Sequence, residues 1–284
     1  MGVIVSYNGL STIQHTLEAV LKNVNKVLII DNGSNSSYIK YLNNLISSRV
    51  TLIEFGENRG IAAALNAGFR FAEQNGYEWI LTMDQDSILD KGFIGAYEDF
   101  LDENPAAVFL FPEVWVHNKK PKKLRKTTKD YVITSGNLVK TKLINKVGLF
   151  NETLFMGNVD FDFCLKVRLL GIKIRNVPNA IMYHQLGEKH EHKGTLATFY
   201  TKHNPLNRYY MYRNSCYLIN QYFSKFPLFC IRLFSSTILL YVAIWVYEGP
   251  KSALKNTKYI YRGVLDFLRN NMGIASNALR NQSD

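Results

Sequence analysis

The stretch 79–87 places the strongest constraint on what this chain can fold into. Its apolar run Trp-Ile-Leu-Thr-Met stops at Asp84-Gln85-Asp86, where two carboxylates are separated by one residue. The run predicts a buried parallel strand, whose carboxyl end lies at the edge where open α/β sheets bind ligands. Two hard oxygen donors at that edge favour Mg²⁺ or Mn²⁺ held jointly with nucleotide phosphates. A solvated turn with an Asx cap explains the same residues, so the pattern alone leaves both interpretations open.

Strand and helix patterns alternate through the rest of the N-terminal half. Apolar strands are predicted at 3–5, 27–30 and 50–55, each followed by an amphipathic helix. The first ends in Ser6-Tyr7-Asn8 and the second in Asp31-Asn32-Gly33-Ser34. This alternation predicts a parallel sheet with right-handed crossovers.

The turn Asn58-Arg59-Gly60 leads from the third strand into a helix rich in small residues. Glycine permits positive φ and close backbone approach, and the following helix N-terminus favours anions. A plain turn before a tightly packed helix is the alternative interpretation. Because the chain has neither a Gly-Lys-Ser/Thr phosphate loop nor a Gly-x-Gly-x-x-Gly fingerprint, the sequence indicates another α/β design for nucleotides.

A later strand, predicted at 131–139, is interrupted by Ser135-Gly136-Asn137. Small polar residues in a strand suit close approach of a sugar or phosphate, and a bulge without a ligand explains them equally well. A helix at 92–103 and a strand at 107–116 precede this segment as core elements.

Asp160 and Asp162 occupy the first turn of a predicted helix that ends at Gly171. The helix dipole alone explains carboxylates at this position. The functional alternative is that one of them is a general base for a hydroxyl nucleophile.

Strand pieces at 172–177 and 180–183 are followed at once by His184. A single histidine here has a structural or a catalytic role, and the pattern does not decide between them. His190 and His192 lack zinc-site spacing and are interpreted as loop residues.

Composition narrows the class of protein. With 284 residues, of which 47% are hydrophobic and 13% aromatic, the chain can bury a large core. The net charge of +11 calls for an anionic partner, namely nucleic acid, nucleotide or an acidic membrane. The basic stretch 117–130 has no aromatic residue before Tyr131, which argues against a stacking surface for nucleic acid and favours a solvated loop. Nucleic acid is therefore not expected as a partner.

The expected compartment is the cytoplasm. The three cysteines are odd in number and form no Cys-x-x-Cys, which fits a reducing environment. No signal-peptide pattern precedes the first strand.

The tail contains one apolar segment and one basic amphipathic helix. Residues 227–247 approach the ~20 residues that cross a bilayer, although Arg232 and several hydroxyl residues make a span marginal. The next helix is amphipathic and basic, which favours an anionic membrane surface. A helical hairpin core or a dimer interface explains the same pattern. We expect peripheral attachment to the inner face of a bacterial cell membrane, and self-association stays open.

Taken in order, the motifs resemble inverting nucleotide-sugar glycosyltransferases of family 2. The similarity spans roughly residues 3–190 and continues into 207–214. The Val-Asp-x-Asp, His-x-Leu-Gly and Arg-Tyr-Tyr…Arg-Asn stretches resemble bacterial rhamnosyltransferases of polysaccharide assembly. The motifs are 3–8, 31–34, 58–60 with Asn66 and Gly68, 84–86, 135–137, 159–162 and 183–187.

The resemblance implies an α/β fold of GT-A type, with a Rossmann-like, mostly parallel sheet flanked by helices and a C-terminal helical extension. The implied catalytic domain is 1–203, with a nucleotide-sugar half at 1–90 and an acceptor half at 91–203. The helical region 204–284 is then membrane-associated or oligomerising.

The resemblance also assigns roles to residues. Asp160 matches the catalytic base and Asp162 its supporting carboxylate. Asp86, Asp84 and His184 match the holders of Mg²⁺ or Mn²⁺. The expected donor-binding residues are Ser6, Tyr7, Asn8, Asp31, Asn58, Arg59, Gly60, Asn66, Asp84, Ser135, Gly136 and Asn137.

The function implied is transfer, with inversion, of a sugar to a hydroxyl of a glycan acceptor, which we expect to be lipid-linked. The favoured donor is dTDP-rhamnose. Alternatives are a family 2 transferase with another nucleotide sugar, a non-catalytic nucleotide-sugar-binding protein, or a nucleotidyltransferase, which usually has a Gly-rich phosphate loop after its first strand.

Overall fold

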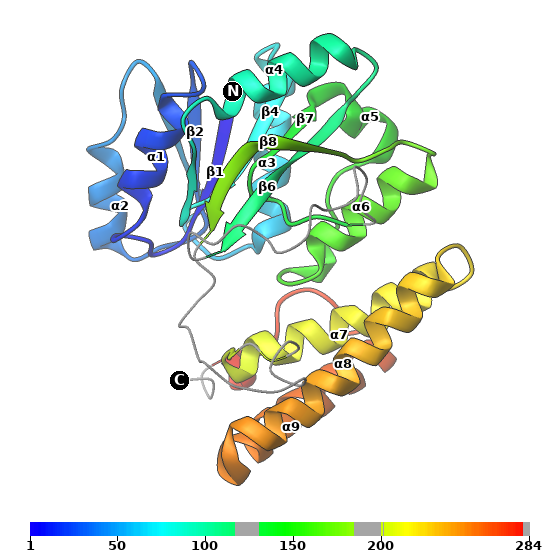
Figure 1. The fold of residues 1–284 in the computed structure, drawn as a ribbon. Coiled ribbons are helices and arrows are strands. Elements are labelled where there is room, and N and C mark those ends of the chain that lie inside the picture. The colour runs from blue at the N-terminus through cyan, green and yellow to red at the C-terminus, as the bar shows by residue number, and fades with distance from the viewer. Residues whose placement is uncertain (117–130, 185–199, 201, 281–284) are drawn as a thin grey trace. The chain divides into compact units, whose positions relative to one another are not determined.

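The computed structural model describes residues 1–116, 131–184, 200 and 202–280 (Figure 1). The basic stretch 117–130 and both His190 and His192 lie outside the described residues. Contacts group the chain into two units. The first is Met1–Phe150 with Phe163–Leu186, and the second is Asn151–Asp162 with Gly187–Asp284. The second unit therefore joins a short central segment to the C-terminal part of the chain.

An eight-stranded sheet forms the first unit, in the order β3-β2-β1-β4-β7-β6-β8-β5. The strands are β1 (Gly2–Ser6), β2 (Val27–Asp31), β3 (Val50–Glu54), β4 (Trp79–Asp84), β5 (Ser87–Leu89), β6 (Phe109–Val116), β7 (Asn137–Lys140) and β8 (Arg175–His184). β1 to β4 are parallel, and β6 and β8 run with them. The expected mostly parallel sheet is confirmed.

Two strands depart from the parallel pattern. β7 is antiparallel to β4 and β6, and β5 is antiparallel to β8. Only Gln85 and Asp86 separate β4 from β5, which leaves no room for the crossover helix that a parallel connection needs. β5 instead pairs at the far edge of the sheet.

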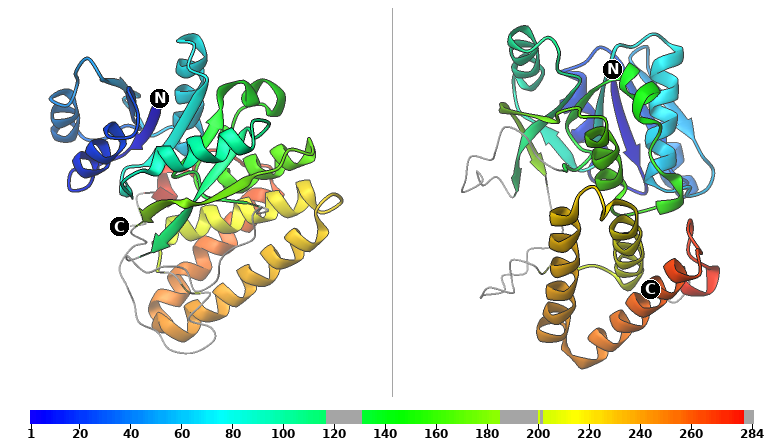
Figure 2. Two further views of the ribbon diagram at one scale, coloured as in Figure 1. Left: turned by 45° about the horizontal axis from the view of Figure 1, so that its top comes forward. Right: turned by 90° about the vertical axis from the view of Figure 1, so that its right-hand side faces the viewer.

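Helices cover both faces of this sheet (Figures 1 and 2). The helical segments of the first unit are α1 (Ile13–Leu21), α2 (Ser36–Asn43), α3 (Ile61–Gln74), α4 (Phe93–Glu103), η1 (Thr141–Leu143), α5 (Ile144–Val147) and the larger part of α6 (Val159–Leu169). The short helix η2 (Glu152–Leu154) and the first turn of α6 belong to the second unit. α3 packs closely because its inner residues are small: a Cβ on Gly68 would lie 2.6 Å from Val3 Cγ1. This close packing fixes β1 and its carboxyl end.

Two strand predictions need correction. The predicted strand 131–139 begins only at Asn137, because Ser135 and Gly136 form a turn in which Gly136 has φ 79° and donates its N–H to Thr82 O at 2.7 Å. The two predicted pieces 172–177 and 180–183 are one strand, β8, whose register shifts opposite Pro112 and Glu113. His184 is thus the last residue of β8.

The second unit contains α7 (Pro205–Tyr222), α8 (Pro227–Tyr247), α9 (Gly249–Leu268) and α10 (Asn277–Arg280). α7 packs against α8 and α9, which also contact each other. The Asn204 side chain caps α7 by accepting from Asn207 N at 2.8 Å, and Pro205 suits the first turn. The expected C-terminal helical extension is confirmed.

Candidate functional site

Four strands of the first unit deliver polar residues to one edge of the sheet. β1, β2, β4 and β8 run in the same direction. Their last residues, Ser6, Asp31, Asp84 and His184, therefore end at the same edge. This is the edge at which open α/β sheets place their ligand sites.

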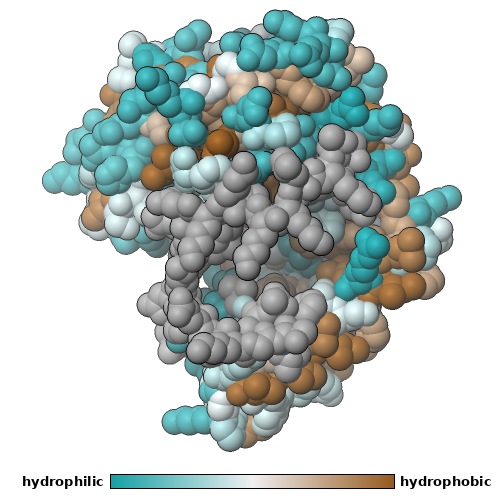
Figure 3. Space-filling view, in the orientation of Figure 1, coloured by the Kyte–Doolittle hydropathy of each residue, from teal (hydrophilic) through white to brown (hydrophobic). Residues whose placement is uncertain are grey.

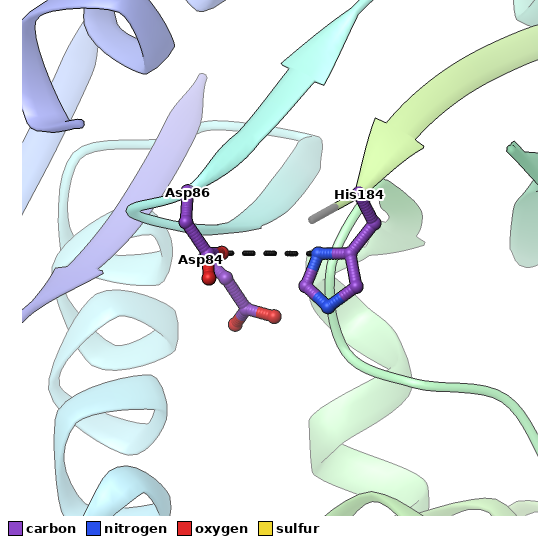
Figure 4. Close-up of side chains that lie close together, drawn as sticks. All are labelled: Asp84, Asp86 and His184. Carbon is purple, nitrogen blue, oxygen red and sulfur yellow. Dashed lines mark ion pairs between the residues drawn. The ribbon is translucent and has the colours of Figure 1, made fainter. Parts of the chain in front are cut away.

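Asp84, Asp86 and His184 converge there (Figure 4). Their potential ligand atoms all lie within 4.8 Å of one another, and His184 Nδ1 is 3.8 Å from Asp86 Oδ1. The structure thus brings together the three residues expected to hold a metal.

The electrostatics of this cluster favour a cation. The pKa of Asp84 is raised to about 6, mainly by burial; the charge of His184 lowers this pKa and the charge of Asp86 raises it. The Oδ1 atom of Asp86 is itself buried and accepts no hydrogen bond from the described residues. Two carboxylates and one imidazole match the donor preferences of Mn²⁺ and, through their oxygens, of Mg²⁺. These residues therefore fit a divalent metal.

A buried chain of hydroxyls supports His184. Ser87 Oγ lies 2.7 Å from His184 Nδ1, and Ser135 Oγ donates to Ser87 Oγ at 2.9 Å. Ser135 Oγ also accepts the Asp84 backbone N–H at 3.1 Å. Both serines have no exposed surface. In this structure, Ser135 thus contacts residues of the cluster, whereas a donor contact of its own stays a prediction.

Gln85, the residue between the two carboxylates, ties β4 to the end of β1. Its Oε1 accepts from Tyr7 N at 2.8 Å and from Ser6 Oγ at 3.0 Å, and its Nε2 donates to Tyr7 O at 3.0 Å. Thr16 Oγ1 donates to Gln85 O at 2.8 Å. A Cβ on Gly9 would lie 2.3 Å from the Gln85 amide, so only glycine leaves room for this contact.

The carboxylate of Asp31 is fully buried. Its Oδ2 accepts the backbone N–H groups of Gly33 at 2.9 Å and Ser34 at 3.0 Å. Its Oδ1 is also buried, with no hydrogen-bond partner among the described residues. An unused buried acceptor is costly, so this atom is suited to a ligand N–H.

Asn32 joins the end of β2 to the predicted turn 58–60. Its Oδ1 accepts Arg59 N at 2.9 Å, and its Nδ2 donates to Asn58 Oδ1 at 3.2 Å. Asn58 Oδ1 also accepts Gly60 N at 3.0 Å, and Gly60 adopts φ 85°. The predicted donor residues Asp31, Asn58, Arg59 and Gly60 therefore belong to one hydrogen-bonded corner.

The other predicted donor residues are distributed more widely. Asn8 has φ 49°, and its Oδ1 accepts from the backbone and side chain of Asn35 at 3.0 and 2.9 Å. Asn66 is buried and exchanges hydrogen bonds with the backbone of Phe150, at 3.0 and 2.8 Å. Asn137 Nδ2 donates to Ile133 O at 2.7 Å, while its buried Oδ1 has no partner among the described residues. Gly136 lies in the turn described above.

Asp160 and Asp162 lie in the first turn of α6, as predicted. Asp160 is partly exposed, and its Oδ1 accepts the N–H of Phe161 at 3.0 Å. Asp162 is fully buried, and Tyr222 donates its hydroxyl to Asp162 Oδ1 at 2.7 Å. Burial and the Asp162 charge raise the pKa of Tyr222, which therefore stays a proton donor. The two carboxylates thus occupy different environments.

Sequence reasoning did not identify Asn32, Gln85 and Ser87 as site residues. Each acts through hydrogen bonds across the sheet edge, which have no periodic signature along the chain. The signal that was available is position, since all three directly follow or flank strand ends that carry predicted ligands.

Comparisons with known proteins agree with this geometry. Residues 3–159 match the family model described as glycosyl transferase family 2. The dTDP-rhamnosyl transferase RfbF of Shigella flexneri is 30% identical over 241 residues, which cover 77% of this chain and 79% of that protein.

Solved structures show the same fold at low identity. GalNAc-T7, solved with UDP, GalNAc and Mn²⁺, is similar with a TM-score of 0.60 and 15% identity, covering 94% of this chain and 55% of that one. This chain therefore spans about half of the GalNAc-T7 chain. S. aureus TarS 1–349 in complex with UDP-GlcNAc gives a TM-score of 0.56 and 15% identity, covering 95% and 91%.

Proposed function

The chain belongs to glycosyl transferase family 2 and has the GT-A fold, and we propose that it is an inverting, metal-dependent rhamnosyltransferase. The observation that carries the proposal is the convergence of Asp84, Asp86 and His184 at the carboxyl edge of the sheet. The favoured donor is dTDP-rhamnose, supported by the name of the S. flexneri relative. The acceptor is a hydroxyl of a glycan, which we propose to be lipid-linked.

The donor is held by the β1, β2 and β4 ends in this proposal. Asp31 Oδ1, buried and without a partner among the described residues, accepts the imide N–H of a pyrimidine base. The corner built by Asn32, Asn58 and Gly60 fixes the backbone around that base. Thymine and uracil both carry this N–H, so Asp31 supports a pyrimidine nucleotide rather than one sugar.

Asp84, Asp86 and His184 hold Mg²⁺ or Mn²⁺ in this proposal, with Ser87 orienting the imidazole. The bound metal supplies positive charge that neutralises the departing diphosphate. Asp160 removes the proton of the acceptor hydroxyl, whose oxygen then attacks the anomeric carbon from the face opposite the leaving group. One base suffices, because no covalent enzyme intermediate forms, and the configuration inverts.

Asp160→Asn tests this assignment. The variant keeps the shape of the side chain but removes its basicity, so transfer should fall by at least about 100-fold while donor binding stays measurable. Retained turnover would overturn the assignment of Asp160. Acceptor-dependent release of nucleoside diphosphate is the expected product signal, whereas pyrophosphate release would indicate a nucleotidyltransferase.

A thermal-shift panel of nucleotide sugars with Mg²⁺ or Mn²⁺ tests the donor. The cognate donor at about 100 times its dissociation constant stabilises the protein by about 2.7 kcal/mol. The largest shift is expected with dTDP-rhamnose. A larger response to a UDP or GDP sugar would contradict the choice of donor but not the transfer reaction. No acceptor-dependent turnover with any donor would favour a non-catalytic nucleotide-sugar-binding protein.

We also propose that the second unit binds the surface of an anionic membrane. Among the described residues, α8 alone is long and apolar enough to cross a bilayer by length and composition, and 28% of its most apolar window is buried. Its exposed apolar side chains recur every three or four residues and make a stripe, along which Figure 3 shows hydrophobic surface. The stripe residues are Leu228, Ile231, Phe234, Ile238, Val242 and Trp245.

The neighbouring helix supplies positive charge. Lys251, Lys255 and Lys258 of α9 line a pocket of about 430 Å³. An apolar stripe on one helix and basic side chains on the helix that contacts it are typical of helices that lie in the interface of anionic bilayers.

Sedimentation with phosphatidylglycerol vesicles tests this attachment. Ile231→Asp should reduce the pelleted fraction, whereas Ile46→Asp, at a similarly exposed apolar residue of the first unit, should not. Equal pelleting of both variants and the wild type would contradict the proposal. Concentration-dependent dimerisation lost only in Ile231→Asp would assign the stripe to a second copy of the chain instead.

A further inference from the structure

Two buried residues of α7, Arg213 and Asn214, donate hydrogen bonds to the backbone carbonyl groups of the segment that precedes Asp160. Asn214 Nδ2 lies within hydrogen-bond distance of three of them, so its two hydrogens are shared among three acceptors. These acceptors are Leu154 O at 2.9 Å, Met156 O at 2.7 Å and Gly157 O at 2.9 Å. Asn214 has no exposed surface, so water does not compete for these bonds.

Arg213 completes the arrangement. Its Nη2 donates to Leu154 O at 3.2 Å and to Thr153 O at 3.4 Å, and its Nη1 donates to Gly273 O at 2.8 Å. Its Nε donates to Asn214 Oδ1 at 3.1 Å, so the two side chains also fix each other. We call Arg213 and Asn214 together the carbonyl clamp.

The clamped segment does not adopt an ordinary backbone. Phe155 has φ 61° and Asn158 has φ 59°, and Gly157 between them has φ 74°. A positive φ is uncommon for a bulky residue such as Phe155 and costs on the order of 1 kcal/mol or more. Such a segment keeps its shape only when its surroundings hold it, and the clamp provides that hold.

α7 also holds the residues on both sides of Asp160. Asn158 Nδ2 donates to Ser215 Oγ at 3.1 Å and to Met211 O at 3.4 Å. On the other side, Tyr222 donates to Asp162 Oδ1 at 2.7 Å. Asp160 therefore lies between two anchor points on one helix.

The clamp is also connected to α9 and to the segment that follows α9, through the two tyrosines beside Arg213. The Arg213 guanidinium lies 5.3 and 5.0 Å from the ring centroids of Tyr209 and Tyr210. Tyr209 donates to Asp266 Oδ2 at 2.9 Å, and Tyr210 accepts Ala275 N at 2.8 Å. The C-terminal helices are thus connected, bond by bond, to the segment that carries Asp160.

We infer that Arg213 and Asn214 are positioning residues for the transfer reaction: through the backbone of 153–158 they set the orientation of the Asp160 carboxylate. This inference rests on the proposed function, in which Asp160 is the base. It assigns a role to the Arg-Asn pair at the end of the Arg-Tyr-Tyr…Arg-Asn motif, which no step of the proposed reaction uses directly.

Asn214→Leu tests the inference, because leucine fills a similar volume without any donor. Donor affinity and donor KM should stay within about 2-fold of wild type. kcat should fall on the order of 100-fold, the effect of misplacing a reacting group by about 1 Å. Arg213→Lys keeps the positive charge but replaces the planar guanidinium, which donates several hydrogen bonds at once, with a single ammonium group. Because only some of these bonds can then form, an intermediate loss of kcat is expected. Asn220→Ala, at an exposed position of α7, is the matched control and should behave as wild type.

Amide hydrogen exchange separates this inference from the assignment of Asp160. Exchange at 154–160 should accelerate in Asn214→Leu and Arg213→Lys, with β1 to β4 unchanged. If Asp160→Asn proves active, the base assignment fails, yet the exchange result still decides whether the clamp holds the segment. Unchanged exchange at 154–160, or a kcat within about 2-fold of wild type in both folded clamp variants, would overturn the inference. Should Asn214→Leu not fold, Arg213→Lys decides the question alone.

Discussion

The hydroxyl of Ser87 lies 2.7 Å from Nδ1 of His184; with the ring proton on Nδ1 and donated to this hydroxyl, Nε2 keeps its lone pair for a metal. Orienting partners of metal-bound histidines typically contribute 10- to 100-fold in affinity. Ser87→Ala should therefore weaken Mn²⁺ binding by about that factor, measured by isothermal titration with a nucleoside diphosphate present. Ser48→Ala, at an exposed serine of the first unit, provides the control. Equal affinity in Ser87→Ala and wild type would show that the hydroxyl does not orient His184.

The raised pKa of Asp84, about 6, makes a prediction about stability without metal. A carboxyl group whose folded pKa lies above its ordinary value of 3.8 favours the folded state while it is protonated. That contribution is fully present below about pH 3.8 and is lost as the pH rises through about 6. In EDTA at pH 7.5, Asp84→Asn should therefore unfold at a higher temperature than wild type. After allowance for partial exposure, the gain is about 1 to 2 kcal/mol.

Thermal unfolding across pH 4 to 8 checks this prediction for Asp84. The advantage of Asp84→Asn should shrink towards pH 4, where the wild-type carboxyl is protonated in the folded protein. Added Mn²⁺ should reverse the order at pH 7.5, because only the wild type keeps both carboxylates. A constant difference across the pH range would show that the Asp84 charge is not its cause.

Gly9 and Gly95 predict opposite outcomes for the same substitution. A Cβ on Gly9 would meet the Gln85 amide, and Gly9→Ala should cost about 1 to 3 kcal/mol as the bonds from Gln85 to Ser6 and Tyr7 break. Gly95 lies within α4 with open space around its Cβ position, so Gly95→Ala should raise stability by about 0.5 to 1 kcal/mol. Urea unfolding measures both, and a stability loss in Gly95→Ala equal to that in Gly9→Ala would contradict the steric argument.

The sheet and the polar residues at its carboxyl edge could be predicted because local patterns determine them. An apolar run that ends in Asp84-Gln85-Asp86 specifies a buried strand with carboxylates at its tip. The parallel direction of β1 to β4 follows from the helices between them. Both inferences need only residues close together in the sequence and the spacing of the apolar residues among them.

What could not be predicted depends on partners that are distant in the sequence. Ser87 and His184 are 97 residues apart, and β5 pairs with β8 although only two residues separate β5 from β4 in the sequence. Asn214 and Leu154 are 60 residues apart, and nothing in the composition of α7 marks which of its polar residues are buried. The family resemblance pointed to the Arg213-Asn214 motif, but only the structure shows which carbonyl groups these two side chains hold.

Asp31 supports a final prediction about the nucleobase. Its Oδ2 is fully used by Gly33 N and Ser34 N, whereas its buried Oδ1 has no partner among the described residues. In Asp31→Asn, the amide oxygen can keep the two backbone bonds, which places an NH₂ group where the ligand-facing acceptor was. A donor then opposes the imide N–H of the base. Affinity for dTDP should fall on the order of 10- to 100-fold, because one buried donor loses its acceptor.

A modified ligand distinguishes this base contact from a general loss of structure. N3-methyl-dTDP lacks the imide N–H, so wild-type protein should bind it about as weakly as Asp31→Asn binds dTDP. The two changes should not add in a double cycle, because both remove the same hydrogen bond. Isothermal titration of both proteins with both ligands measures the cycle. Additive losses would mean that Asp31 acts elsewhere and that its buried oxygen is not the site of base recognition.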